Sequence, residues 1–73
     1  MTKQEFSKSM QTLLDFYKHE LTPFQVRVWF ELFEPFDKKK FDFAINKHLR
    51  TDEDTRFPAL GKIMNILNPR VMG

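Results

Sequence analysis

Two helix-start signals constrain the fold of this chain more than any other feature. Thr2 with Glu5, and Thr22 with Gln25, are capping boxes, in which each side chain accepts a hydrogen bond from the other residue's backbone N–H. Pro23 follows the second cap at the first helical position, where a missing N–H costs nothing. Apolar residues then recur at helical spacing. The pattern predicts one helix from about residue 3 to 20 and another from 23 to about 33.

Two further helices are predicted in the second half of the chain. Asp37 is the expected cap of the third helix, and Pro58 is the expected first residue of a short fourth helix that Asn68 and Pro69 end. Residues 51–55 are acidic, lack periodicity and are predicted to form a loop. No stretch alternates with period two for long enough to make a strand. We therefore expect an all-α, compact domain of four helices.

The second helix has the most apolar circumference. On a helical wheel its apolar side chains cover about 240°, and the polar strip consists of Arg27, Glu31 and Glu34. Such a helix is expected to be central and packed by the others. The shared core is predicted to include Trp29, Leu32, Phe41, Ile45 and Ile63.

The length of 73 residues leaves room for one core. We expect a single domain over residues 1–69 and a short C-terminal tail over 70–73. A chain with 41% hydrophobic and 15% aromatic residues is too apolar to be disordered. The absence of cysteine fits a reducing cytosol. No apolar run approaches the roughly 18 residues that a membrane span requires, so we expect a soluble monomer.

Signals of catalysis or metal binding are nearly absent. His19 and His48 lack the spacing of a metal site, and His48 is interpreted as a partly buried helix residue. Residues 52–54 lack the glycine and the bidentate glutamate of a calcium loop, which favours a solvated acidic loop. Gly61 and Gly73 form no phosphate-binding loop. We predict no enzymatic activity, no cofactor and no metal.

The third helix carries an unusual basic face. Phe43 lies about 160° from the apolar stripe of this helix, with Lys39 and Lys47 one turn away on either side. One reading is a solvated face whose aromatic ring folds under the loop of residues 51–56. The other is a binding surface for an acidic protein or a nucleic-acid backbone. The five cations of this helix are Lys38, Lys39, Lys40, Lys47 and Arg50.

Three segments have a specific order and spacing. They are Trp29 with Leu32, then Ala44-Ile45-x-x-His48-Leu49, and then Phe57-Pro58-Ala59-Leu60-x-x-Ile63. Together they resemble the bacteriophage loader-and-inhibitor family that acts on hexameric replicative helicases of the DnaB type. The resemblance covers about residues 22–67.

The resemblance implies a non-enzymatic phage DNA-replication factor in the cytoplasm of a bacterial host cell. Its partners are expected to be a hexameric replicative helicase, which it inhibits and loads, and an origin-bound initiator. The candidate partner-binding residues lie on the basic face and in the tail. They are Lys38, Lys39, Lys40, Phe43, Lys47, Arg50 and Arg70.

Two alternatives remain open at this point. A small helical DNA-binding module would use the same basic helix to approach phosphates. The net charge of only +2 and the acidic residues 52–54 beside the helix argue modestly against it. The other alternative is a phage inhibitor of a different host protein, which the sequence does not exclude.

Overall fold

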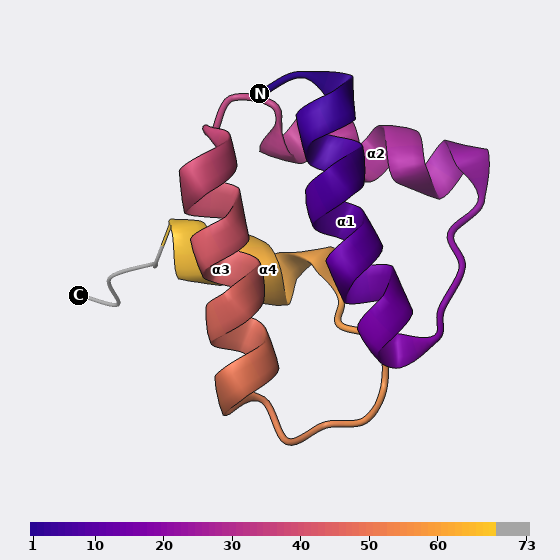
Figure 1. The fold of residues 1–73 in the computed structure, drawn as a ribbon, viewed down its shortest axis with the longest axis vertical. Helices are drawn as coiled ribbons and strands as arrows, with labels where there is room; N and C mark the ends of the chain where they lie inside the picture. Colours follow the sequence, from indigo (N-terminus) through magenta and orange to yellow (C-terminus); the bar gives the residue numbers. More distant parts are fainter. Residues whose placement is uncertain (69–73) are drawn as a thin grey trace.

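The computed structural model describes residues 1–68 and confirms the all-α fold (Figure 1). No strand is present in this part of the chain. Pro69 and the tail of residues 70–73, including Arg70, lie outside the described residues. The four helices are α1 (Lys3–Tyr17), α2 (Pro23–Phe33), α3 (Lys38–Thr51) and α4 (Leu60–Leu67).

Both predicted capping boxes are present. At the start of α1, Thr2 Oγ1 accepts from the Glu5 N–H at 3.1 Å, and Glu5 Oε1 accepts from the Thr2 N–H at 2.9 Å. Thr22 and Gln25 repeat this exchange at the start of α2, at 3.2 and 2.9 Å. Each box satisfies two N–H groups at a helix terminus, so these two starts are set by local chemistry.

The end of α1 differs from the prediction. The helix ends at Tyr17 rather than at Glu20, because Lys18 adopts a left-handed conformation with φ 49° and ψ 48°. The N–H groups of Lys18 and His19 then bond back to carbonyls of the last helical turn at 3.2 and 3.0 Å. Lysine has no special preference for this conformation, so the sequence carries no signal for this stop.

The start of α3 is as predicted, whereas the start of α4 is not. Asp37 Oδ1 accepts from the Lys40 N–H at 2.8 Å. Pro58 is buried in an extended segment, and Ala59 is the cap of α4 although its side chain cannot accept a hydrogen bond. The proline is therefore used for packing and not as the first helical residue. Helix α4 begins at Leu60.

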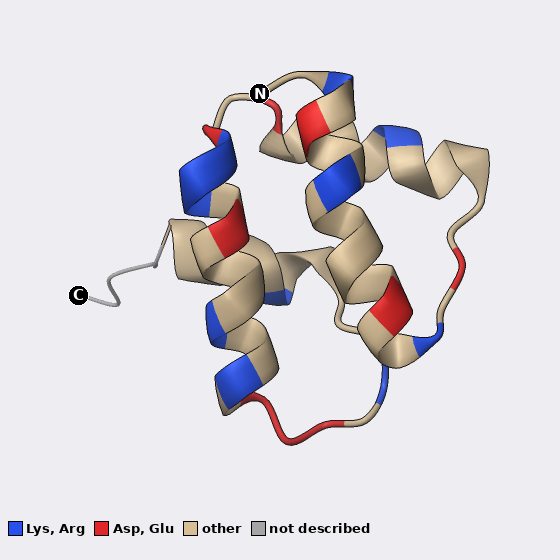
Figure 2. Ribbon diagram, viewed as in Figure 1, with Lys and Arg blue, Asp and Glu red and all other residues tan. Residues whose placement is uncertain are grey.

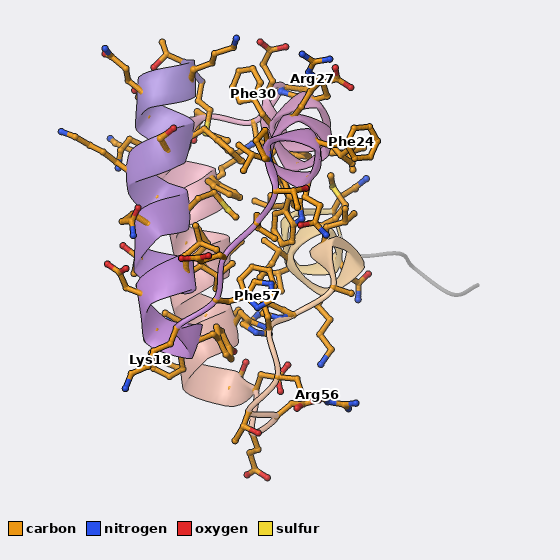
Figure 3. All side chains as sticks on the ribbon, turned by 90° about the vertical axis from the view of Figure 1, so that its right-hand side faces the viewer. Lys18, Phe24, Arg27, Phe30, Arg56 and Phe57 are labelled. Atoms are coloured by element: carbon orange, nitrogen blue, oxygen red, sulfur yellow. The ribbon has the colours of Figure 1, made fainter. Side chains whose placement is uncertain are left out.

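The helices lie in two layers. Figure 1 shows α1 and α3 side by side and running in the same direction. Turned by 90°, Figure 3 shows α2 and α4 together on one side of that pair. The closest helix packing is that of α3 on α4 and of α1 on α3. The prediction that the second helix is central is therefore wrong, because α3 has this position.

Helix α2 reaches the core through long aromatic side chains. The Phe33 ring lies 5.6 Å from the Trp29 ring and 4.9 Å from the Phe41 ring of α3, measured between centroids. Because these side chains are large, α2 does not need the close backbone approach that α3 makes. The buried core consists of Phe6, Met10, Leu13, Trp29, Phe33, Phe41, Ala44, Ile45 and Ile63.

The outer face of α2 stays uncovered. Leu32 was predicted to belong to the core, but it is 41% exposed, and Phe24 is 73% exposed. Val28 lies between them at the i, i+4, i+8 spacing that places three residues on one helix face. The rest of the fold covers one side of α2, and within residues 1–68 no further helix covers the opposite side.

Replacement of Trp29 by alanine tests the core. The ring is 5% exposed, so Trp29→Ala should lower the free energy of unfolding by about 3–5 kcal/mol. Leu32→Ala in the same helix is the matched control and should cost about 1 kcal/mol or less, because Leu32 is largely outside the core. Urea denaturation followed by circular dichroism measures both. Equal losses would contradict the burial described above.

Candidate functional site

The outer side of α3 is a continuous basic stripe. Its residues share one helix face of about 120°, at 100° per residue, and all of them are exposed. No acidic residue lies within this face. Figure 2 shows the basic segments at both ends of α3, with one acidic segment between them. The basic stripe consists of Lys39, Lys40, Phe43, Asn46, Lys47 and Arg50.

Phe43 lies in the middle of the basic stripe. It is 56% exposed, so the loop of residues 51–56 does not cover its ring. The Lys47 Nζ atom lies 6.0 Å from the ring centroid, at the outer limit of a cation–π contact. The reading in which the ring folds under that loop is therefore wrong, and the ring is open to solvent.

Lys38 belongs to a different face of the helix. Its Nζ donates to Asp42 Oδ2 at 2.6 Å, and the other Asp42 oxygen accepts a hydrogen bond from the Ser9 hydroxyl of α1. This carboxylate joins α1 to α3 and neutralises Lys38. We therefore leave Lys38 out of the basic stripe, while Arg70 lies outside the described residues.

In the described part of the chain, no carboxylate pairs with the cations of the stripe. Within residues 1–68, no ion pair includes Lys39, Lys40, Lys47 or Arg50. Lys39 and Lys40 also lie in the first turn of α3, where the helix dipole opposes positive charge. The charges of Lys39 and Lys40 therefore do not stabilise the helix, whereas Arg50 in the last turn is favoured by the dipole. All four cations present a positive surface around one aromatic ring.

The acidic loop after α3 is not simply solvated, as the sequence had suggested. Asp52 accepts from Lys62 Nζ of α4 at 3.0 Å and from the Asp54 N–H at 2.8 Å. Asp54 accepts from Arg56 at 2.9, 3.2 and 3.0 Å. Hydrogen bonds from the Arg56 side chain, more than any other contact, lower the pKa of Asp54 to about 2. Two of the three acidic side chains are thus paired, and only Glu53 adds uncompensated charge here.

His48 is fully buried, at 3% exposure, in a polar contact that the sequence did not reveal. Its Nε2 lies 2.9 Å from the Tyr17 hydroxyl of α1, and its Nδ1 lies 3.5 Å from Asp52 Oδ2. A neutral ring with its proton on Nδ1, toward the carboxylate, lets the tyrosine hydroxyl donate to Nε2. Burial lowers the pKa of His48 below its ordinary value of 6.5, against the attraction of Asp52.

The polar contacts around His48 are structural in character. The His19 ring stacks on Phe57 at 4.2 Å instead of approaching His48. Across residues 1–68, no group of three or more His, Cys, Asp or Glu side chains is placed to hold a metal ion. None of the four helices in this region is long and apolar enough to cross a membrane.

Comparisons with known proteins do not identify the chain. No family model, curated protein or solved structure matches it significantly. A function is therefore inferred from the geometry of the basic stripe and from the resemblance of residues 22–67.

The buried histidine predicts a specific pH dependence of stability. The unfolded chain takes up a proton at His48 near pH 6.5, whereas the folded state does so only at a lower pH because burial lowers the pKa. The stability that this residue contributes is complete above about pH 6.5 and is lost as the pH falls through the pKa of the folded state. Asp54, with a pKa of about 2, titrates below this window.

Urea unfolding between pH 7.5 and 5 measures this effect. The free energy of unfolding should fall with decreasing pH in the natural protein, and His48→Gln should flatten this part of the profile. An increase in stability toward pH 5 would instead show that the Asp52 carboxylate dominates and that folding raises the proton affinity of His48.

Proposed function

We propose that this protein is a non-enzymatic binding factor whose basic stripe docks on an acidic surface of a hexameric replicative helicase. The observation that carries the proposal is Phe43, a large aromatic side chain that is 56% exposed among four cations that form no ion pair within residues 1–68. The identity of the partner rests on the resemblance to the phage loader-and-inhibitor family.

The chemistry of the stripe suits a protein partner. Aromatic and arginine side chains dominate the binding energy of protein interfaces, usually near the centre of the contact. Phe43 is central in the stripe, while Lys39, Lys47 and Arg50 surround it. In this arrangement the ring supplies buried apolar area, and the cations attract and orient an acidic partner before contact.

Inhibition and loading require a preference between states of the helicase. A bound factor shifts an equilibrium only if it binds one state more tightly than the other. A domain that binds one conformation of the helicase hexamer more tightly would inhibit ATP-driven cycling until another factor displaces the domain. In this proposal the protein restrains the helicase and delivers it to an origin-bound initiator.

A DNA-binding module is the second candidate. The 14 residues of α3 give a helix about 21 Å long, at 1.5 Å per residue, with cations along most of it. Ion pairs neutralise Asp52 and Asp54, so the acidic loop opposes DNA less than the sequence suggested. Phe43 favours the protein partner, because a half-exposed ring contributes little to contacts with duplex phosphates.

Phe43→Ala is the first test of the proposal. It should weaken helicase binding by about 2 kcal/mol, near thirtyfold in Kd, and change the free energy of unfolding by less than about 0.5 kcal/mol. Phe16→Ala is a matched control, since Phe16 is a similarly exposed phenylalanine, at 61%, on a different helix, α1. Titration calorimetry, together with ATPase inhibition at saturating protein, measures the effect.

The two variants must differ for the proposal to stand. Equal loss of binding in both would point to a general effect of exposed aromatic residues. If Phe43→Ala loses stability in parallel with binding, Phe43 is a structural residue. Normal helicase activity at saturating protein would rule out the helicase as the target.

Charge reversal tests the role of the cations. The double variant Lys39→Glu, Lys47→Glu should slow association with the helicase, and the difference from the natural protein should shrink as salt increases. The same change in charge at Lys3 and Lys8, which are exposed on α1, should have a smaller effect. Stopped-flow binding at several ionic strengths gives the rates.

Retention on DNA separates the two candidate functions. A DNA-binding module would bind duplex DNA with an affinity that falls linearly on a logarithmic salt scale, and Lys39→Glu, Lys47→Glu would reduce that slope. A protein-binding factor should bind DNA only weakly at physiological salt. Strong, salt-dependent DNA binding without helicase binding would replace the first proposal by the second.

A further inference from the structure

The outer face of α2 is an apolar stripe without a partner in residues 1–68. Phe24, Val28 and Leu32 follow one another at i, i+4 and i+8, and they are 73% exposed, partly buried and 41% exposed, respectively. Figure 3 shows Phe24 projecting away from the body of the protein. Large apolar side chains that share one exposed face mark interaction sites more often than scattered ones do.

Two opposite charges border this stripe along one edge. Arg27 and Glu31 are one helical turn apart, both are exposed, and neither forms an ion pair within residues 1–68. In Figure 3 Arg27 extends from α2 beside Phe24. The edge therefore carries one free positive and one free negative group, in a fixed order along the helix.

This order makes the face complementary to itself. A two-fold axis beside Val28 brings a second, antiparallel α2 against the first, with Val28 opposite its own copy and Phe24 opposite Leu32. In an antiparallel pair of helices, equivalent edges face each other. The Arg27 side chain of each copy then approaches Glu31 of the other, which gives two symmetric ion pairs.

We propose that the chain forms a weak homodimer through α2, with Phe24, Val28 and Leu32 packed across the two-fold axis and with reciprocal Arg27 to Glu31 ion pairs at its edge. The 11 residues of α2 span about 16 Å, at 1.5 Å per residue. A single helix of this length buries less than the roughly 800 Å² per partner of a standard interface. The dimer is therefore expected to depend on concentration and to dissociate on dilution.

The dimer is independent of the proposed contact with a helicase. Helices α2 and α3 belong to different layers of the fold, as Figure 3 shows. Pairing through α2 leaves the basic stripe of α3 available. A dimer presents two copies of that stripe, which strengthens binding to a partner with repeated subunits through effective concentration.

Complementary charge reversals test the interface. Arg27→Glu places two negative edges opposite each other in a homodimer, and Glu31→Arg places two positive edges there. Each single variant should be monomeric, with a dissociation constant at least tenfold higher than that of the natural chain. An equal mixture of the two variants should associate again, because the two carboxylates on the edge of the first then meet the two guanidinium groups on the edge of the second.

Sedimentation velocity of the full chain from about 10 µM to 1 mM measures association, and circular dichroism verifies that each variant is folded. Lys39→Glu, a reversal on the basic stripe, is the matched control and should dimerise as the natural chain does. Phe24→Ala should weaken the dimer without a change in melting temperature, since the ring is 73% exposed.

Three outcomes would overturn the dimer. The first is a natural chain that remains monomeric at 1 mM, and the second is a mixture of Arg27→Glu and Glu31→Arg that associates no better than either variant alone. The third is that the natural chain is monomeric and Phe24→Ala weakens helicase binding. This result would assign the α2 face to contact with the partner protein. Loss of helicase binding by Phe43→Ala is a separate result and leaves the dimer unaffected.

Discussion

The packing of this small domain depends on the contacts of the Phe41 ring of α3 with aromatic rings of two other helices. This ring is fully buried and lies 5.6 Å from the Phe6 ring of α1 and 4.9 Å from the Phe33 ring of α2. Three helices therefore meet at one side chain of α3, and Ile63 adds a buried contribution from α4. A domain of this size buries only about 60% of the surface of its unfolded chain, so each large buried side chain contributes a substantial share of its stability.

The small size of the domain also explains why the two surfaces that we assign to binding are exposed. Four short helices cover the inner sides of one another, and nothing else in residues 1–68 covers the outer sides of α2 and α3. The outer side of α3 carries charge around one ring, whereas the outer side of α2 is apolar. The first suits an acidic partner and the second suits a copy of itself. Charged side chains on α3 are well solvated by water. Exposure of the apolar Phe24 ring to water is unfavourable, which is typical of a surface that binds a partner.

The basic stripe was accessible from the sequence because helical spacing alone groups Lys39, Phe43 and Lys47. The helix starts were accessible for a similar reason, since a capping box involves residues three apart. Helical spacing also places Lys38 beside Asp42, but the sequence could not show that this pair faces α1, because the contact of Asp42 with Ser9 spans 33 residues. The Tyr17 contact of His48, across 31 residues, was hidden in the same way.

The sequence by itself determined the helical class of the protein, three of the helix starts and the basic face of α3, because each depends on groups within about one turn of helix. Only the tertiary structure decided which helix is central. The apolar pattern of α2, which covers about 240° of the helix, predicted burial on most of its sides. Burial requires neighbours, and residues 1–68 supply them for Trp29 and Phe33 but not for Phe24 and Leu32. The apolar composition of a helix face favours its burial, but the number and placement of the neighbouring helices determine whether it is buried.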